Sequence, residues 1–163
     1  MNFILLDHND TKAVKAMSKM ATAILREHYD PILGSEQNDY MLKKFQSEHA
    51  ISQQIADGYH YYFVKVDKTD VGFIAIIPHL DCMYLSKLYL YKHERGKGYS
   101  RQIIDFISAK AHEIGLHAIE LNVNRFNPSI RPYEALGFQR VRAEKNDIGN
   151  GYFMDDYVYR LEI

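Results

Sequence analysis

Residues Tyr89–Ile104, with the sequence YLYKHERGKGYSRQII, decide the expected fold of this chain. An apolar strand leads into a basic, glycine-rich turn, and the turn leads directly into a helix. Glycine lets the backbone adopt unusual dihedral angles and approach a ligand closely. The first N–H groups of a helix have no partner within it and carry the positive end of its dipole. Because Arg95, Lys97 and Arg101 add positive charge there, the stretch predicts a binding site for a pyrophosphate group.

The glycine spacing separates this turn from two other phosphate-binding motifs. The P-loop pattern is absent because Gly96 and Gly98 lie only two residues apart. The dinucleotide fingerprint fails because Arg101 occupies its third glycine position. The hexapeptide at residues 95–100, RGKGYS, instead resembles the [RQ]-x-x-G-x-[GA] motif of the GNAT superfamily of N-acetyltransferases, which binds the pyrophosphate of acetyl-coenzyme A. Ser100 departs from the usual glycine or alanine but is also small.

This resemblance implies a set of contacts to acetyl-coenzyme A. The backbone of Leu88 and Leu90 is expected to pair with the pantetheine arm like an added β-strand. Asn127 is expected to contact the cofactor, although it stands six residues before Tyr133, where many family members place an asparagine seven before. Asn127 is equally placed to cap the helix that follows. The expected pyrophosphate site consists of Arg95, Gly96, Lys97, Gly98, Tyr99, Ser100 and Arg101.

A second segment, YEALGF at Tyr133–Phe138, resembles the Y-x-x-x-G-F segment of the same family, whose tyrosine often serves as general acid. When an amine attacks the thioester, sulfur leaves as a thiolate, for which the pKa of a free cysteine, about 8.5, is a guide. A phenol with a pKa of about 10 stays protonated and can give its proton to that sulfur. The resemblance therefore implies that Tyr133 is the catalytic acid, whereas a plain core aromatic is the alternative.

Composition is typical of one folded domain spanning residues 1–163 and excludes several classes. Apolar residues make up 47% of the chain and no run is long enough to span a membrane, so no membrane partner is expected. The net charge of −1 argues against a nucleic-acid partner. The single cysteine, Cys82, suits a cytoplasmic protein without disulfides. The eight histidines show no paired ligand spacing, so no metal is expected.

Hydrophobic periodicity predicts a mixed α/β chain. Asp10 is expected to cap a first helix that breaks over Tyr29–Ser35, where Pro31 and Gly34 stand, and a second helical region is expected to end at Gly58. Further helices are expected after the basic turn, up to Gly115, and at Pro128–Leu136. The expected strands are Asn2–Asp7, Tyr59–Val66, Val71–Ile77, Cys82–Tyr91, Leu116–Val123, Phe138–Glu144 and Tyr152–Leu161.

The order β-α-α-β-β-β-α-β-α-β-β resembles that of the GNAT fold. The resemblance implies an α/β (α+β) architecture with a mixed central sheet of about seven strands, splayed in the middle, flanked by about four helices.

The acceptor side of the reaction carries a weaker signal. An alkylamine with a pKa of about 10 is almost fully protonated at pH 7, so its deprotonation needs help. Many relatives place a glutamate near positions 84 or 86, but Tyr84 and Ser86 stand here. Asp81 and Glu120 are the nearest acidic residues in the sequence, and neither is assigned as the base. Residues expected to contact a cationic acceptor are Tyr29, Tyr84, Asp155 and Asp156.

These features predict an N-acetyltransferase that transfers an acetyl group from acetyl-coenzyme A to a small-molecule amine, in a protein that could form a homodimer. An acetyltransferase for protein N-termini or lysines is one alternative. A non-catalytic acyl-coenzyme A sensor is another, because the strand glutamate is missing.

Overall fold

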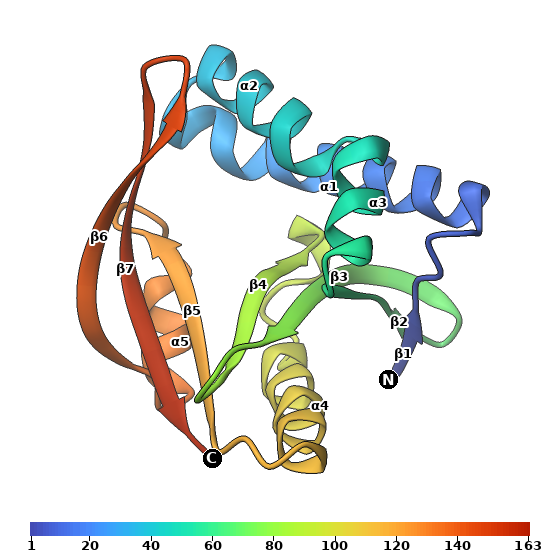
Figure 1. Cartoon of the computed structure of the whole chain (residues 1–163), viewed down its shortest axis with the longest axis vertical. Coiled ribbons are helices and arrows are strands. Elements are labelled where there is room, and N and C mark those ends of the chain that lie inside the picture. The colour runs from blue at the N-terminus through green and yellow to red at the C-terminus, as the bar shows by residue number, and fades with distance from the viewer. The chain divides into compact units, whose positions relative to one another are not determined.

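The structure is a computed structural model that describes all residues, Met1–Ile163. It contains seven β-strands, five α-helices and one short 3-10 helix (Figure 1). The strands are β1 Asn2–Leu5, β2 His60–Val66, β3 Thr69–Pro78, β4 Met83–Leu90, β5 Ala118–Asn124, β6 Gln139–Gly149 and β7 Tyr152–Glu162. The helices are α1 Thr11–Leu33, α2 Ser35–Gln46, α3 Glu48–Ala56, α4 Tyr99–Glu113, α5 Ile130–Ala135 and the 3-10 helix η1 Lys92–Glu94.

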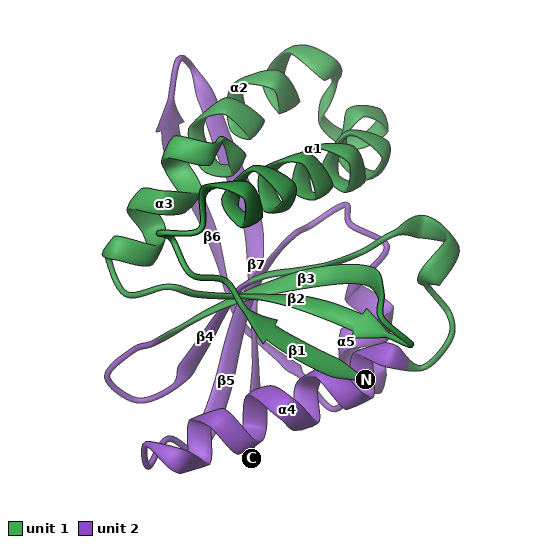
Figure 2. Cartoon of the chain, turned by 90° about the vertical axis from the view of Figure 1, so that its right-hand side faces the viewer, with its two compact units in different colours: residues 1–77, 87–98 green, residues 78–86, 99–163 purple.

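The chain forms two compact units, which Figure 2 shows in different colours. Unit 1 comprises residues 1–77 and 87–98, and unit 2 comprises residues 78–86 and 99–163. Strand β4 gives its first half to unit 2 and its second half to unit 1. The strands are hydrogen-bonded in the order β1-β2-β3-β4-β5-β7-β6, so the sheet has the seven strands that the sequence predicts.

In unit 1, antiparallel strands carry a layer of three helices. β1 pairs with β2, and β2 pairs with β3 through a tight turn in which Asp67 and Lys68 both have positive φ. One face of β2 and β3 is aromatic and apolar, and it packs against α1 and its neighbouring helices in a single core. The strand residues of that core are Tyr61, Phe63, Phe73 and Ala75.

Helix α1 begins as expected, since the Asp10 carboxylate accepts a hydrogen bond of 3.1 Å from the N–H of Ala13. The expected break within Tyr29–Ser35 lies at Gly34, which has a φ of 83° and ends the helix. Pro31 does not break the helix, which continues to Leu33. Proline costs one helical hydrogen bond, but Ile32 and Leu33 pack against the core of unit 1 and hold the last turn.

The second helical region is two helices rather than one, so five α-helices replace the expected four. Ser47 separates α2 from α3 with an extended backbone, and its hydroxyl accepts a hydrogen bond of 3.2 Å from the N–H of Ala50. Serine favours this capping role because its side chain satisfies an N–H that the new helix leaves unpaired. The apolar periodicity continues across the junction, which is why the pattern alone did not separate the two helices.

Gly72 fixes how closely β4 approaches β3 within unit 1. A Cβ atom at this position would lie 2.1 Å from the carbonyl oxygen of Tyr89 and 2.9 Å from the Cα of Leu90. No side chain fits there. The end of β4, immediately before the basic turn, is therefore held against β3 backbone to backbone.

The strands of unit 2 are β5, β6, β7 and the first half of β4, and its helices are α4 and α5. β7 pairs antiparallel with both β5 and β6, and the β6–β7 hairpin extends to Gly149, five residues beyond the expected end of β6 (Figure 1). β4 pairs parallel with β5 over Met83–Leu85 and Ile119–Leu121. The ladder ends there although both strands continue. Helix α4 packs against β5 through Ile103, Ile104, Ile107 and Ala111.

Candidate functional site

The basic turn has the backbone that its glycines predict. Gly96 and Gly98 have φ of 76° and 80°, a region that side chains other than glycine rarely adopt. Helix α4 begins at Tyr99, directly after the second glycine, and has no acidic residue in its first turn. The unpaired N–H groups of that turn therefore remain suited to an anion.

Basic side chains surround this turn, and all of them are exposed or partly exposed. Arg95 donates a hydrogen bond of 3.2 Å from Nε to the carbonyl of Leu90, and its guanidinium lies 3.5 Å from the Nδ1 of His28. Lys97 forms an ion pair of 2.9 Å with Glu94. Arg95 is thus tied to the end of β4 while its charge faces outward, and Lys97 is partly neutralised by its neighbour.

Tyr133 is buried, with 9% of its surface exposed, on the short helix α5. Its ring packs edge to face with Phe138 at 5.7 Å between centroids. The two ends of the YEALGF segment therefore contact each other, as residues five apart across a helix end can. The burial of Tyr133 is compatible with both alternatives, a catalytic acid and an aromatic residue of the core.

Asn127 is also buried, but the expected helix cap is wrong in detail. Helix α5 begins at Ile130 rather than at Pro128, and its N-cap residue is Ser129. The side-chain oxygen of Asn127 accepts a hydrogen bond of 2.9 Å from the N–H of Ser129. This local turn precedes the helix and uses the asparagine carbonyl that a helix cap would have used.

The residues expected to contact the acceptor have different surroundings. Tyr29 is buried in the core of unit 1, where its ring lies edge to face with that of Tyr89 at 6.2 Å. Asp155 forms an ion pair of 2.7 Å with Arg125, which offsets its attraction for a cation. Tyr84 stacks on His79 at 4.9 Å between ring centroids.

Asp156 differs from the other acidic residues because it is almost fully buried, with 5% of its surface exposed. Burial is the main cause that raises the pKa of its carboxyl group to about 6, and the charges of Asp155 and Glu144 act in the same direction. A hydrogen bond with Asn122 and the charge of Arg125 oppose that rise. The carboxylate therefore holds a proton more readily than an exposed aspartate does.

Sequence analysis did not single out Asn122, which connects three of these side chains within unit 2. Its side-chain oxygen accepts a hydrogen bond of 3.0 Å from the Tyr84 hydroxyl, and its amide nitrogen donates one of 3.2 Å to Glu144. Glu144 also accepts a hydrogen bond of 2.9 Å from Arg142, which is the main cause that lowers the pKa of Glu144. An asparagine on an alternating strand gives no signal for this role until β5, β6 and β7 are paired.

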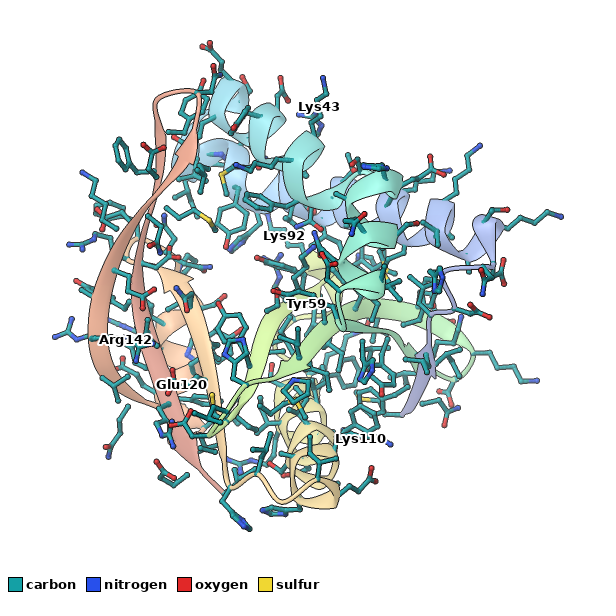
Figure 3. All side chains as sticks on the ribbon, viewed as in Figure 1. Lys43, Tyr59, Lys92, Lys110, Glu120 and Arg142 are labelled. Atoms are coloured by element: carbon teal, nitrogen blue, oxygen red, sulfur yellow. The ribbon has the colours of Figure 1, made fainter.

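Asp81 and Glu120, the two acidic residues considered in place of the missing strand glutamate, are both engaged in ion pairs. Glu120 lies 2.7 Å from Arg160 and 3.3 Å from Arg142, and Asp81 lies 3.4 Å from Arg160. Figure 3 labels Glu120 on β5 and Arg142 on β6, the two strands that lie on either side of β7. Each carboxylate therefore already has an arginine partner.

A buried lysine is the second feature that sequence analysis missed. Lys87, on β4, has 7% of its surface exposed, and its ammonium group contacts the carbonyl of Phe45 and the side chains of Gln46, Gln54 and Tyr61. Burial lowers its pKa from 10.5 to about 7. The only signal in the sequence is a lysine within the otherwise apolar run MYLSKLYL.

Other kinds of site are not supported. Burial raises the pKa of the Cys82 thiol to about 11, so this thiol is not an activated nucleophile. The residues that could ligate a metal ion, His, Cys, Asp and Glu, do not gather in groups of three or more. None of the helices has the length and apolar character needed to cross a membrane.

Comparison with known proteins agrees with this geometry. The sequence family described as the acetyltransferase (GNAT) domain matches residues 29–154, which is most of the chain. No curated protein sequence matches the chain.

Solved structures with the same fold cover nearly the whole chain. The N-acetyltransferase paia from Thermoplasma acidophilum, in complex with coenzyme A, is 18% identical over 100% of both chains, with a TM-score of 0.79. A GCN5-related N-acetyltransferase from Rhodopseudomonas palustris is 12% identical over 99% of this chain and 95% of its own, with a TM-score of 0.80. A spermidine N-acetyltransferase chimera from Vibrio cholerae and hSSAT is 18% identical over 99% and 96%, with a TM-score of 0.66.

At these identities the structural likeness shows the fold alone, whereas the family match covers both the basic turn and the YEALGF segment. The chain therefore belongs to the GNAT family of acetyltransferases, enzymes whose acyl donor is acetyl-coenzyme A.

Proposed function

We propose that this acetyltransferase transfers the acetyl group of acetyl-coenzyme A to a primary amine of a small cationic molecule, by direct attack in a ternary complex. The observation that supports acetyl-coenzyme A binding is the basic turn. Its two glycines have positive φ, and helix α4 begins directly after the second one. A pyrophosphate at that position would meet unpaired N–H groups and the positive end of the helix dipole.

Further contacts to the cofactor follow from the same placement. The proposed pyrophosphate ligands are Arg95, Gly96, Lys97, Gly98, Tyr99, Ser100 and Arg101. We propose that the backbone of Leu88 and Leu90 pairs with the pantetheine amides, because the ladder between β4 and β5 has already ended at Leu85. Asn127, which is buried in the turn just before α5, is proposed as an additional contact.

Tyr133 is the proposed general acid. A phenol has an ordinary pKa of about 10, so it carries the proton that a donor to a leaving thiolate needs. We propose that its hydroxyl gives a proton to the sulfur when the carbon–sulfur bond breaks.

The proposal of a small cationic acceptor rests on the acidic residues of unit 2. Asp156 is buried and not neutralised by a direct ion pair, whereas Asp155 and Glu144 each have an arginine partner. A buried carboxylate without a cation of its own favours a ligand that brings one. Tyr84 is connected to Asp156 by two hydrogen bonds through Asn122, and its aromatic ring can lie against such a ligand. Tyr29 remains a proposed acceptor contact at the edge of the core.

The experiment is a panel of acceptors with acetyl-coenzyme A and the whole chain, in which release of free coenzyme A is measured and the acetylated product is identified by mass spectrometry. Polyamines and other small di- and tricationic amines should give the highest kcat/KM. A preference for peptides would support the alternative of a protein acetyltransferase. One solved structure with the same fold is described as a ribosomal-protein-alanine N-acetyltransferase. Cofactor binding without turnover of any acceptor would overturn the proposal in favour of a sensor.

A further inference from the structure

Two carboxylates in unit 2 face the same asparagine but lie in opposite environments. Glu144 on β6 accepts hydrogen bonds from Arg142 and Asn122 and stays ionised. Asp156, opposite it on β7, is buried and has no arginine within ion-pair distance. When their surroundings push the pKa values of two neighbouring carboxyl groups in opposite directions, the group with the raised pKa is the one able to exchange a proton near neutral pH.

The position of Asp156 relative to the strand ladder supports a catalytic use. Asn122 is the first residue of β5 beyond the end of the β4–β5 ladder, and Tyr84 lies in the last part of β4 that is still paired. The hydrogen bonds Tyr84–Asn122 and Asn122–Asp156 therefore place Asp156 beside the point where the two strands stop pairing. The proposed pantetheine contacts, Leu88 and Leu90, follow on β4 after that same ladder end.

Tyr133 lies on the other side of the strand that carries Asp156. Helix α5 is linked to β7 by the hydrogen bond between Glu134 and Tyr159, and Gly137, just after the helix, faces Leu161, whose Cδ1 would lie 3.3 Å from a Cβ at that glycine. These β7 residues have odd numbers, whereas Asp156 has an even one, and side chains alternate between the two faces of a strand. The proposed acid and Asp156 thus belong to opposite faces of the β5–β7 pair.

We infer that Asp156 is the general base that accepts a proton from the acceptor amine, with Asn122 and Tyr84 as its positioning residues. This inference rests on the proposed function. The carboxylate takes a proton from the ammonium, and the nitrogen lone pair attacks the carbonyl carbon of the thioester. The carbon–nitrogen bond forms, the carbon–sulfur bond breaks, and the sulfur takes a proton from Tyr133. The new amide nitrogen loses its second proton to solvent. The phenolate recovers a proton from solvent and Asp156 releases its own, so one proton is released per turnover.

The chemistry of the carboxyl group fits this role better than that of an exposed aspartate. Its pKa is raised from 3.8 to about 6, so it accepts a proton about 100-fold more readily than an unperturbed aspartate does. It is nevertheless ionised at pH 7. The charged groups that face it are Glu144 on β6, Asp155 beside it and Arg125 after β5, and the two carboxylates and the arginine act in opposite directions.

The test compares wild type with Asp156→Asn, which keeps the shape and can still bond to Asn122. Each is assayed with two acceptors of similar size, an alkylamine with a pKa near 10 and an analogue whose amine has a pKa below the assay pH. With the alkylamine, kcat should fall about 100-fold or more. The inflection near pH 6 in the wild-type pH profile should be replaced by a rate that rises steadily with pH, because only the neutral fraction of the amine then reacts. With the weakly basic analogue the loss should be less than about 10-fold, because that nitrogen arrives already neutral.

Controls separate this role from its alternatives. Glu162→Gln on the same strand removes an exposed carboxylate and should leave both rates unchanged. Asp156→Glu restores a carboxylate one methylene further out and should recover part of kcat together with the inflection of the pH profile. Melting temperatures and the affinity for coenzyme A report whether each variant is folded.

Three outcomes would overturn the inference. Equal losses with both acceptors would indicate a structural role, and a rise in KM at constant kcat would indicate cation binding only. An Asp156→Asn enzyme with unchanged rates would exclude any role. The proposed function is tested separately by the wild-type arm, because an enzyme that prefers peptides over small amines refutes the proposed acceptor while the variant comparison still reports on Asp156.

Discussion

The ammonium group of Lys87 lies 2.9 Å from the side-chain oxygen of Gln46, so a charged residue of strand β4 is bonded to the end of helix α2 inside unit 1. The same nitrogen also contacts the backbone of Phe45 and the side chains of Gln54 and Tyr61, and no carboxylate is among these partners. A buried ammonium with only neutral acceptors is costly to keep charged. This cost has consequences for stability that can be measured.

The free energy of unfolding should therefore rise with pH in a way that depends on Lys87. The pKa of Lys87 is about 7 in the folded chain and 10.5 in the unfolded chain, so between these values the unfolded chain binds a proton that the folded chain does not. Wild type should gain about 2 kcal/mol relative to Lys87→Met between pH 7 and pH 9. Urea unfolding at both pH values measures this difference.

The control for Lys87 is Lys43→Met, which removes an exposed lysine from α2 (Figure 3). The unfolding free energy of this variant should follow that of wild type at every pH. A constant difference between wild type and Lys87→Met across the range would contradict a lowered pKa for the buried lysine.

Replacement of Gly98 should weaken cofactor binding. Gly98→Asp keeps a residue that tolerates positive φ better than most, but it places a carboxylate beside the proposed pyrophosphate site. The Kd for acetyl-coenzyme A, measured by titration calorimetry, should rise at least about 10-fold. Gly115→Asp is the matched control, since Gly115 has nearly the same φ of 78° but stands after the opposite end of α4. If the two variants bind the cofactor equally well, the proposed pyrophosphate site is misplaced.

Removal of the Tyr133 hydroxyl should slow the reaction without weakening cofactor binding. Loss of a general acid typically costs about 10²- to 10⁴-fold in rate, so kcat of Tyr133→Phe should fall within that range while the Kd for acetyl-coenzyme A stays within about twofold. Stopped-flow or steady-state release of coenzyme A gives the rate. Tyr59, which stands just before β2 and outside the proposed site, provides the control, and Tyr59→Phe should behave as wild type (Figure 3). A Tyr133→Phe enzyme at full speed would leave Tyr133 as a core aromatic.

Asp156 should destabilise the folded chain at neutral pH. Its pKa is higher in the folded chain, about 6, than the ordinary value of 3.8, so the folded state binds an extra proton between these values and loses stability as pH rises through them. The advantage of Asp156→Asn over wild type should grow by about 2 kcal/mol from pH 4 to pH 7. Chemical unfolding of both proteins at the two pH values measures it, and Glu162→Gln provides the comparison. A parallel pH dependence for all three proteins would show that the Asp156 carboxyl group is not perturbed.

Sequence patterns predicted most of the elements because those elements depend on local chemistry. Asp10 caps α1, Gly115 follows the end of α4, and runs rich in aromatic and β-branched residues form β2 and β3, as expected. The errors occurred where packing overrode a local rule. Pro31 remains helical because the residues after it are held by the core, and Ser47 divides one apolar pattern into two helices.

The candidate site divides in the same way. A pyrophosphate-binding turn can be read from consecutive residues, since glycine dihedrals and the N-terminus of a helix are both local properties. The sequence by itself therefore predicted the family and the proposed donor half of the reaction, in which Arg95–Ser100 and Tyr133 have the proposed roles. Only the tertiary structure decided which acidic residue is buried, because Asn122, Glu144 and Asp156 come from three strands that become neighbours when the sheet pairs. Desolvation and hydrogen bonding by distant residues set the pKa values of Asp156 and Lys87, and those surroundings exist only in the folded chain.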